Sequence, residues 1–131
     1  NATGKTENLI LHLNLRIRGW ANYYRHVASK DTFNYIDNRI FQALMRWIKR
    51  RHPEKSIKWR NKKYFRTQGM RRWMFSVKLK NKRGESYFFD LFLASQTPIR
   101  RHIKIKAEAN PYDPKYAEYF FKRECLTLER Y

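Results

Sequence analysis

Residues 16–26 read RIRGWANYYRH, and this stretch decides the first part of the fold. At about 100° per residue, its apolar side chains and those just after it share one side of a helix, namely Ile17, Trp20, Ala21, Tyr24, Val27 and Ala28. The spacing predicts a helix that packs on a core through this face and runs to about Ala28. The residues before it, Thr6–Leu13, predict a short separate helix, with Asn14 as the N-cap of the longer one.

The opposite side of this helix is polar and contains a glycine. Gly19 lies among Asn22, Tyr23 and His26, and the flanks carry three arginines, Arg16, Arg18 and Arg25. A glycine inside a helix costs about 1 kcal/mol relative to alanine, which suggests that something packs closely against the backbone there. A neighbouring element of the protein and a nucleic-acid backbone both fit this pattern. The predicted nucleic-acid-binding residues of this helix are Arg16, Arg18, Gly19, Asn22, Tyr23, Arg25 and His26.

Two more helices follow. Apolar residues between Phe33 and Ile48 recur every three or four positions and predict a long helix, capped by residues 29–32, that ends before Pro53. Ser56 can cap a third helix containing Trp59, Tyr64 and Phe65, which Gly69 closes in a left-handed conformation. We therefore expect a three-helix bundle over residues 3–68.

The pattern then changes to a period of two. Residues 73–79 and 87–93 alternate in polarity around the turn sequence 81–84, which predicts a β-hairpin. A third strand is expected over residues 99–106, and the Asp113-Pro114 pair predicts the start of a last helix. The predicted fold class is α+β, mostly α, with residues 69–131 forming a small hairpin and extended appendage that ends in a short C-terminal helix.

The charge of the chain points to a polyanion. The 131 residues carry 30 Lys and Arg against 11 Asp and Glu, a formal charge of +19, and ten of these cations but one acid fall between residues 46 and 66. Aromatic residues 47, 59, 64 and 65 are interleaved with them, and rings of this kind can stack on unpaired bases, although the helical phase of Trp47 places it in the core. The predicted nucleic-acid-binding residues here are Arg46, Lys49, Arg50, Arg51, Lys58, Arg60, Lys62 and Lys63; a solvated basic face is the alternative.

A second basic stretch occurs near residue 100. In an extended strand, alternate side chains are about 6–7 Å apart on one face, which is close to the phosphate repeat of a nucleic-acid strand. We expect this stretch to bind nucleic acid through Arg100, Arg101, His102, Lys104 and Lys106. The alternative is an edge strand that its lysines protect against aggregation.

Other classes of function find little support. The sequence has no apolar run long enough to span a membrane, so we expect no membrane partner. The single cysteine, Cys125, suits a reducing cytoplasm. We expect no catalytic residue, no metal site and no cofactor in this chain. The four histidines are scattered, there is no glycine-rich loop, and the acids are far apart in the sequence, at expected element ends or turns: Asp31, Asp37, Asp90 and Asp113. Since the first residue is not methionine, we expect a piece of a longer protein.

Five motifs in order resemble one family. They are residues 17–25 (IRGWANYYR), 49–53 (KRRHP), 62–65 (KKYF), 97–104 (TPIRRHIK) and 110–114 (NPYDP). Together they are similar to the maturase-specific region of bacterial group II intron reverse transcriptases, over about residues 9–123. One departure is Leu15, where the family often has proline.

The resemblance implies a role within a larger enzyme. In this family the region follows the polymerase fingers and palm, acts as a thumb on template–primer duplex and as the RNA-binding maturase segment, and leads into a DNA-binding region and often a nuclease. It thus implies group II intron RNA and template–primer or target DNA as partners in splicing and retroelement mobility. Mg²⁺ is expected for the parent RNA-directed DNA polymerase and the intron ribozyme only, because the polymerase and nuclease motifs are absent here. A general basic nucleic-acid-binding module and a nuclease fragment remain the alternatives.

Overall fold

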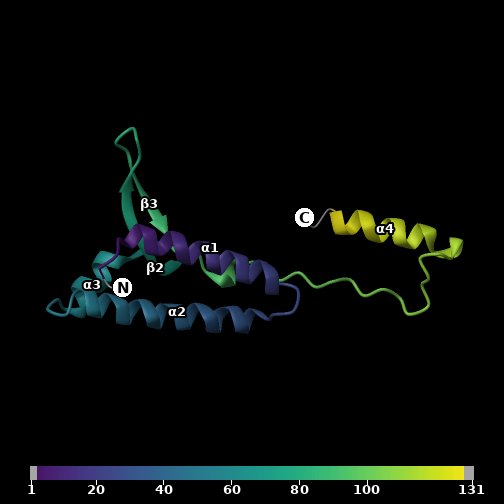
Figure 1. The fold of residues 1–131 in the computed structure, drawn as a ribbon, viewed down its shortest axis with the longest axis horizontal. Helices are drawn as coiled ribbons and strands as arrows, with labels where there is room; N and C mark the ends of the chain where they lie inside the picture. Colours follow the sequence, from purple (N-terminus) through teal and green to yellow (C-terminus); the bar gives the residue numbers. More distant parts are fainter. Residues whose placement is uncertain (1–2, 129–131) are drawn as a thin grey trace. The chain divides into compact units, whose positions relative to one another are not determined.

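The computed structural model describes residues 3–128 and divides into two compact units, one up to Arg101 and one from His102. The first unit contains helices α1 to α3, a three-stranded sheet and the 3-10 turn η1 (Figure 1). The second contains the turn η2 and helix α4. The prediction of an α+β fold, mostly α, is confirmed. The structural division falls later than residues 68 and 69, because the sheet packs with the helices in the first unit; the expected functional division between residues 3–68 and 69–131 stays a prediction.

Two long antiparallel helices form the frame of the first unit (Figure 1). They are α1, Thr6–Tyr24, and α2, Lys30–Arg51, which Ser29 caps by accepting a hydrogen bond from the backbone N–H of Thr32. Both contribute apolar side chains to one core, whose fully buried members include Ile10, Phe33 and Ile48. At one end of the pair, Arg51 donates to the carbonyl of Gly4. The long helix ends before Pro53, as its sequence predicts.

Helix α1 differs from the prediction at both ends. It is continuous from Thr6, and Asn14 lies buried in its middle, so the expected break and N-cap at Asn14 are wrong. At position 15, where the family often has proline, this chain has leucine, whose backbone N–H can take part in helix hydrogen bonding. The helix continues through Leu15 without a break. The helix also ends at Tyr24, before the expected Ala28, and the side chain of Val27 is 71% exposed instead of packed.

The third helix is shorter than expected. Helix α3, Ile57–Tyr64, begins at the predicted cap Ser56, which accepts from the N–H of Trp59. It ends four residues early because Phe65–Gln68 form strand β1. Gly69 does adopt a positive φ of 58°, but it does so in the turn between two strands and not at a helix end.

The sheet has the order β1-β2-β3 and is antiparallel throughout. Strand β2, Arg71–Lys80, and strand β3, Ser86–Asp90, form the predicted hairpin, with Ser76 opposite Asp90 and Lys80 opposite Ser86. In its turn, Asn81 accepts hydrogen bonds from the N–H groups of Arg83 and Glu85. β3 is shorter than the alternation suggests, because the chain leaves the ladder after Asp90 and enters η1, Ala94–Gln96.

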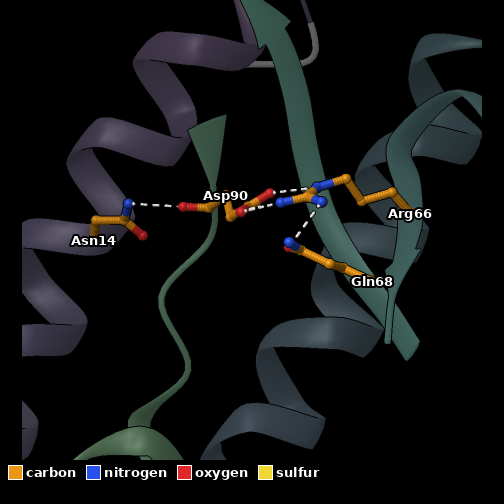
Figure 2. A network of polar contacts seen from close by, with 4 residues as sticks. All are labelled: Asn14, Arg66, Gln68 and Asp90. Atoms are coloured by element: carbon orange, nitrogen blue, oxygen red, sulfur yellow. Dashed lines mark hydrogen bonds and ion pairs between the residues drawn. The ribbon is translucent and has the colours of Figure 1, made fainter. Parts of the chain in front are cut away.

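A polar network joins α1 to the sheet (Figure 2). The side chain of Asn14 donates to the carbonyl of Asp90 over 3.1 Å and accepts from the N–H of Phe92 over 2.7 Å. The amide thus pairs with the same backbone groups that the backbone of a neighbouring strand would pair with. The carboxylate of Asp90 accepts from Nε of Arg66 over 2.8 Å and forms an ion pair with the same guanidinium, which also donates to Gln68. One cation of the basic segment is therefore used inside the fold.

The turn η1 is held on α2 from both ends. The carboxylate of Asp37 accepts from the N–H groups of Ala94 and Ser95 over 2.7 and 2.9 Å, and the ammonium of Lys30 donates to the carbonyls of Ser95 and Thr97. Asp37 lies in the middle of α2, so its expected place at an element end or in a turn is wrong. Its carboxylate is occupied by backbone groups instead.

The second unit is built around helix α4, Ala117–Leu128, which follows η2, Pro114–Tyr116. Asp113 caps η2 by accepting from the N–H of Lys115, which confirms the predicted helix start. The strand expected over residues 99–106 is not formed. In place of a neighbouring strand, Arg123 of α4 donates to the carbonyls of Ile103 and Lys104, and the hydroxyl of Tyr119 accepts from the N–H of Lys106. These side chains satisfy backbone groups that a sheet would otherwise have paired.

Candidate nucleic-acid interface

The densest group of cations covers the end of α2 and helix α3. We call it the α2–α3 patch; its exposed members are Arg46, Lys49, Arg50, Lys55, Lys58, Lys62 and Lys63. Arg60 fixes α3 against the end of α2, because its guanidinium donates to the carbonyls of His52 and Pro53 over 3.0 and 3.1 Å. Arg51, also predicted to bind, is half-buried, donates to Gly4 and lies 5.1 Å from the ring of Trp47. Arg51 and Arg60 therefore stabilise the fold beneath the patch through contacts with backbone carbonyls and with Trp47.

Trp59 is the accessible aromatic ring of the α2–α3 patch. It is 37% exposed, and two ammonium groups lie near its ring centre, that of Lys63 at 4.9 Å and that of Lys55 at 5.4 Å. The ring of His52 also packs against it edge-on, with 5.0 Å between the ring centres. An exposed cation–π contact is worth about 0.5–1 kcal/mol, whereas stacking of a base on an aromatic ring is worth about 1–3 kcal/mol. A base can therefore displace one lysine from the ring.

The other aromatic residues of the segment are structural. Tyr64 and Phe65 are 4% and 9% exposed, so the expectation that they stack on bases is wrong. Trp47 packs against the core with its ring edge-on to Tyr64, as its helical phase predicts. Burial raises the pKa of Tyr64, and burial together with Lys63 and neighbouring cations lowers the pKa of His52. The hydroxyl of Tyr64 and Nε2 of His52 share a hydrogen bond over 2.7 Å, whose donor depends on the tautomer of His52.

A second basic group lies at the end of α1. It unites residues that are more than 70 positions apart: the N–H of Arg100 donates to the carbonyl of Arg25, the ring of His26 bonds the carbonyl of Arg100 over 2.6 Å, and Arg101 donates to the carbonyl of His26. We call this group, with its neighbours on α1, the α1-end patch; it consists of Arg16, Arg18, Asn22, Tyr23, Arg25, His26, Arg100 and Arg101. No local pattern in the sequence could have predicted this pairing.

The outer face of α1 is open around Gly19. A Cβ placed on Gly19 meets nothing within 4 Å, so the close neighbour expected there is not an element of the described chain. Asn22 is exposed and Tyr23 is 76% exposed, and the guanidinium of Arg18 lies 4.9 Å from the ring centre of Phe92. A close neighbour within the described chain is therefore not found at Gly19, and contact with a nucleic-acid backbone stays a prediction.

The two patches lie at opposite ends of the α1–α2 pair, since α1 ends beside the start of α2 and α3 follows the end of α2 (Figure 1). Helix α2 has 22 residues and is about 33 Å long at 1.5 Å per residue. The nearest members of the two patches are closer than this length, because Arg16 and Arg18 lie just past the middle of α1 and Arg46 lies before the end of α2.

The last three residues that the sequence predicted to bind nucleic acid belong to the second unit. His102, Lys104 and Lys106 are exposed, and the ammonium of Lys106 lies 5.3 Å from the ring centre of Tyr119. The strand on which the sequence grouped them with Arg100 and Arg101 is not formed, and the boundary between the two units falls after Arg101.

Residues 3–128 contain neither a membrane-spanning helix nor a metal-binding cluster. None of the helices there is long and apolar enough to cross a membrane. Within the same residues, no three His, Cys, Asp or Glu side chains come together as a group that could hold a metal ion.

The fold and its surface define a basic, mostly helical domain whose exposed cations cluster at two ends of a helix pair. Residues 1–65 match the family model of the group II intron maturase-specific domain. This part of the chain belongs to that family, and the resemblance seen in the sequence is confirmed there. The matched domain is maturase-specific and not catalytic. It ends at Phe65, so most of the sheet and the whole second unit lie beyond it, and no curated protein is significantly similar to the chain.

Proposed function

We propose that the chain binds group II intron RNA and thereby helps the intron to hold its splicing-competent fold. The observation that carries this proposal is the α2–α3 patch, whose seven exposed cations lie in a segment, residues 46–66, that contains one acid, Glu54. Phosphates would neutralise these cations and release counterions, and Trp59 would stack on an unpaired base. The match to the maturase-specific domain supports intron RNA as the ligand.

A role as polymerase thumb belongs to the same proposal. Helix α2 is about 33 Å long, which is close to one turn of a nucleic-acid duplex, about 34 Å. A template–primer duplex laid along the helix pair would meet basic groups at both ends. The parent chain would supply the RNA-directed DNA polymerase and its Mg²⁺, and this part would position the duplex without catalysing a step, in the bacterial cytoplasm.

The test is a competition titration. Labelled group II intron RNA is displaced by unlabelled intron, unrelated structured RNA and duplex DNA at several salt concentrations. With five to eight phosphate contacts, log K should fall with log salt at a slope of about −4 to −7, and the preference for intron RNA should persist at high salt. Equal competition by every polyanion would favour a general basic module, and metal-dependent cleavage of the RNA would favour a nuclease fragment.

Charge variants separate the two patches. Lys58→Gln/Lys62→Gln removes two exposed cations of the α2–α3 patch, Arg16→Gln/Arg18→Gln removes two of the α1-end patch, and Lys82→Gln/Arg83→Gln removes two from the hairpin turn as a control. Each phosphate that a variant no longer binds should reduce the salt slope by about 1. We expect both patch variants to show a larger decrease in affinity and slope than the hairpin variant does. Equal decreases in all three variants would contradict the proposed interface.

A further inference from the structure

A cavity of about 240 Å³ lies between strand β2 and the turn η1, and no residue that defines either patch lines it. Apolar side chains from β2 and from the chain after β3 line one part of it, namely Met74, Phe75, Leu91 and Leu93. The remainder is polar: two arginines, Arg71 and Arg72, together with Ser95 and Gln96. Ligand sites commonly combine an apolar lining with a few convergent polar groups in this way.

A bulge brings the two arginines to the same cavity. Adjacent residues of a strand normally point to opposite faces, yet Arg71 and Arg72 both line this site. In the pairing of β1 with β2, Arg66 faces Met74 and Gln68 faces Arg71, so β2 has one extra residue between these pairs. Trp73, in the extra position, has a φ of 60°, a conformation that bulky side chains rarely adopt. Bulges re-aim side chains and are frequent beside functional sites.

The arginines are available for a ligand. Both are exposed, and the described residues give neither guanidinium a hydrogen bond, ion pair or ring contact. The nearby carboxylate of Asp90 is already engaged by Arg66. Guanidinium groups bind phosphate in a bidentate geometry, so an anion with phosphate oxygens suits this site.

The opposite wall is rigid. Asp37 and Lys30 of α2 hold η1, which carries Ser95 and Gln96, at both of its ends. The floor is fixed as well, because the N–H of Leu91 donates to the carbonyl of Phe75 over 2.8 Å. A preformed wall and floor reduce the cost of ordering a ligand.

We propose that this cavity binds one unpaired nucleotide of RNA, with its base on the apolar lining and its phosphate held by Arg71 and Arg72. The volume is below the 300–1,000 Å³ of sites for drug-sized ligands, so it fits one base and not a stacked pair. Sequence-specific proteins commonly read RNA through such splayed bases, and the amide of Gln96 can pair with an adenine edge. The inference rests on the proposed function, since it names a further contact of the same RNA.

The first experiment uses small probes on the whole chain. Backbone amide and methyl resonances are followed by NMR while adenosine monophosphate, adenosine or inorganic phosphate is added. We expect the monophosphate to shift the signals of Leu91, Leu93 and Gln96 and to bind about tenfold more tightly than either part alone. Arg71→Gln/Arg72→Gln should lower this affinity about tenfold, and the matched control Lys82→Gln/Arg83→Gln should leave it unchanged. Equal binding by phosphate alone, or no effect of the arginine variant, would overturn the proposal.

The second experiment compares an RNA hairpin that carries a one-nucleotide bulge with its fully paired form. The wild-type chain should prefer the bulged RNA, and Arg71→Gln/Arg72→Gln should remove the preference while binding to the paired form persists. If adenosine monophosphate binds at the cavity but the chain does not prefer intron RNA, the proposed function fails and the cavity stands. If intron RNA is preferred and the monophosphate does not bind there, the cavity proposal fails alone.

Discussion

Replacement of Asn14 by alanine should destabilise the first unit by about 2 kcal/mol. The side chain of Asn14 forms two hydrogen bonds with backbone groups at the end of β3, at 3.1 Å to Asp90 and 2.7 Å from Phe92 (Figure 2). Each is worth about 1 kcal/mol net, and the part-buried N–H and carbonyl left behind add a desolvation cost. Alanine recovers about 0.5 kcal/mol through its better helix propensity, which leaves a net loss of about 2 kcal/mol.

The assay is urea unfolding followed by circular dichroism, with Asn38→Ala as the control. Asn38 is exposed in the middle of α2, so the same substitution there should change stability by less than about 0.5 kcal/mol. In a thermal scan, the loss at Asn14 should lower the melting temperature of a unit of this size by about 10 °C.

A second variant separates the hydrogen bonds from the volume of the side chain. Asn14→Leu preserves most of the volume and removes both hydrogen bonds, so we expect it to be about as destabilising as Asn14→Ala. If leucine restored wild-type stability, or if the Asn14 and Asn38 alanine variants were equally stable, the strand-like role of this amide would be refuted.

Three further predictions concern α1, the α2–α3 patch and η1. Gly19→Ala should raise stability by up to about 1 kcal/mol, because a Cβ meets nothing there, and should weaken intron RNA binding; unchanged affinity would exclude a close approach of the RNA backbone. Burial and Lys63 lower the pKa of His52 below its ordinary 6.5, so the unfolded chain takes up this proton first and stability should fall as pH drops below about 6.5. His52→Gln should flatten that part of the stability–pH curve, and an identical slope in both proteins would contradict the assignment. Asp37→Asn leaves one acceptor for the two N–H groups of η1 and should cost about 1–2 kcal/mol in urea unfolding, whereas Asp31→Asn at the exposed start of α2 should cost clearly less.

Local patterns in the sequence were sufficient for most elements of this protein. The three-to-four spacing of apolar residues predicted α2 with its end before Pro53, Ser56 was correctly predicted as a cap, and the Asp113-Pro114 pair was correctly predicted as a helix start. Period-two alternation located the hairpin of β2 and β3. These signals are reliable because helix phase, capping and strand alternation depend on residues within a few positions of one another.

The errors occurred where distant residues decide the local structure. Asn14 looks like a helix cap, but it lies inside α1 because a strand end 76 residues away satisfies its amide. The stretch 102–106 alternates like a strand, yet side chains of α4 bind its backbone. In both cases the partner of a polar group lies far along the chain, and only the folded structure shows it.

The sequence by itself determined the charge, the order of the helices and the motifs of the maturase-specific domain, because each depends on composition or on near neighbours. Only the tertiary structure decided how the cations are grouped. It joined Arg100 and Arg101 to the end of α1, used Arg66 in an ion pair with Asp90, and re-aimed two adjacent arginines into one cavity. The physical reason is that a charge acts on a ligand through its position in space, which packing sets and the sequence order does not.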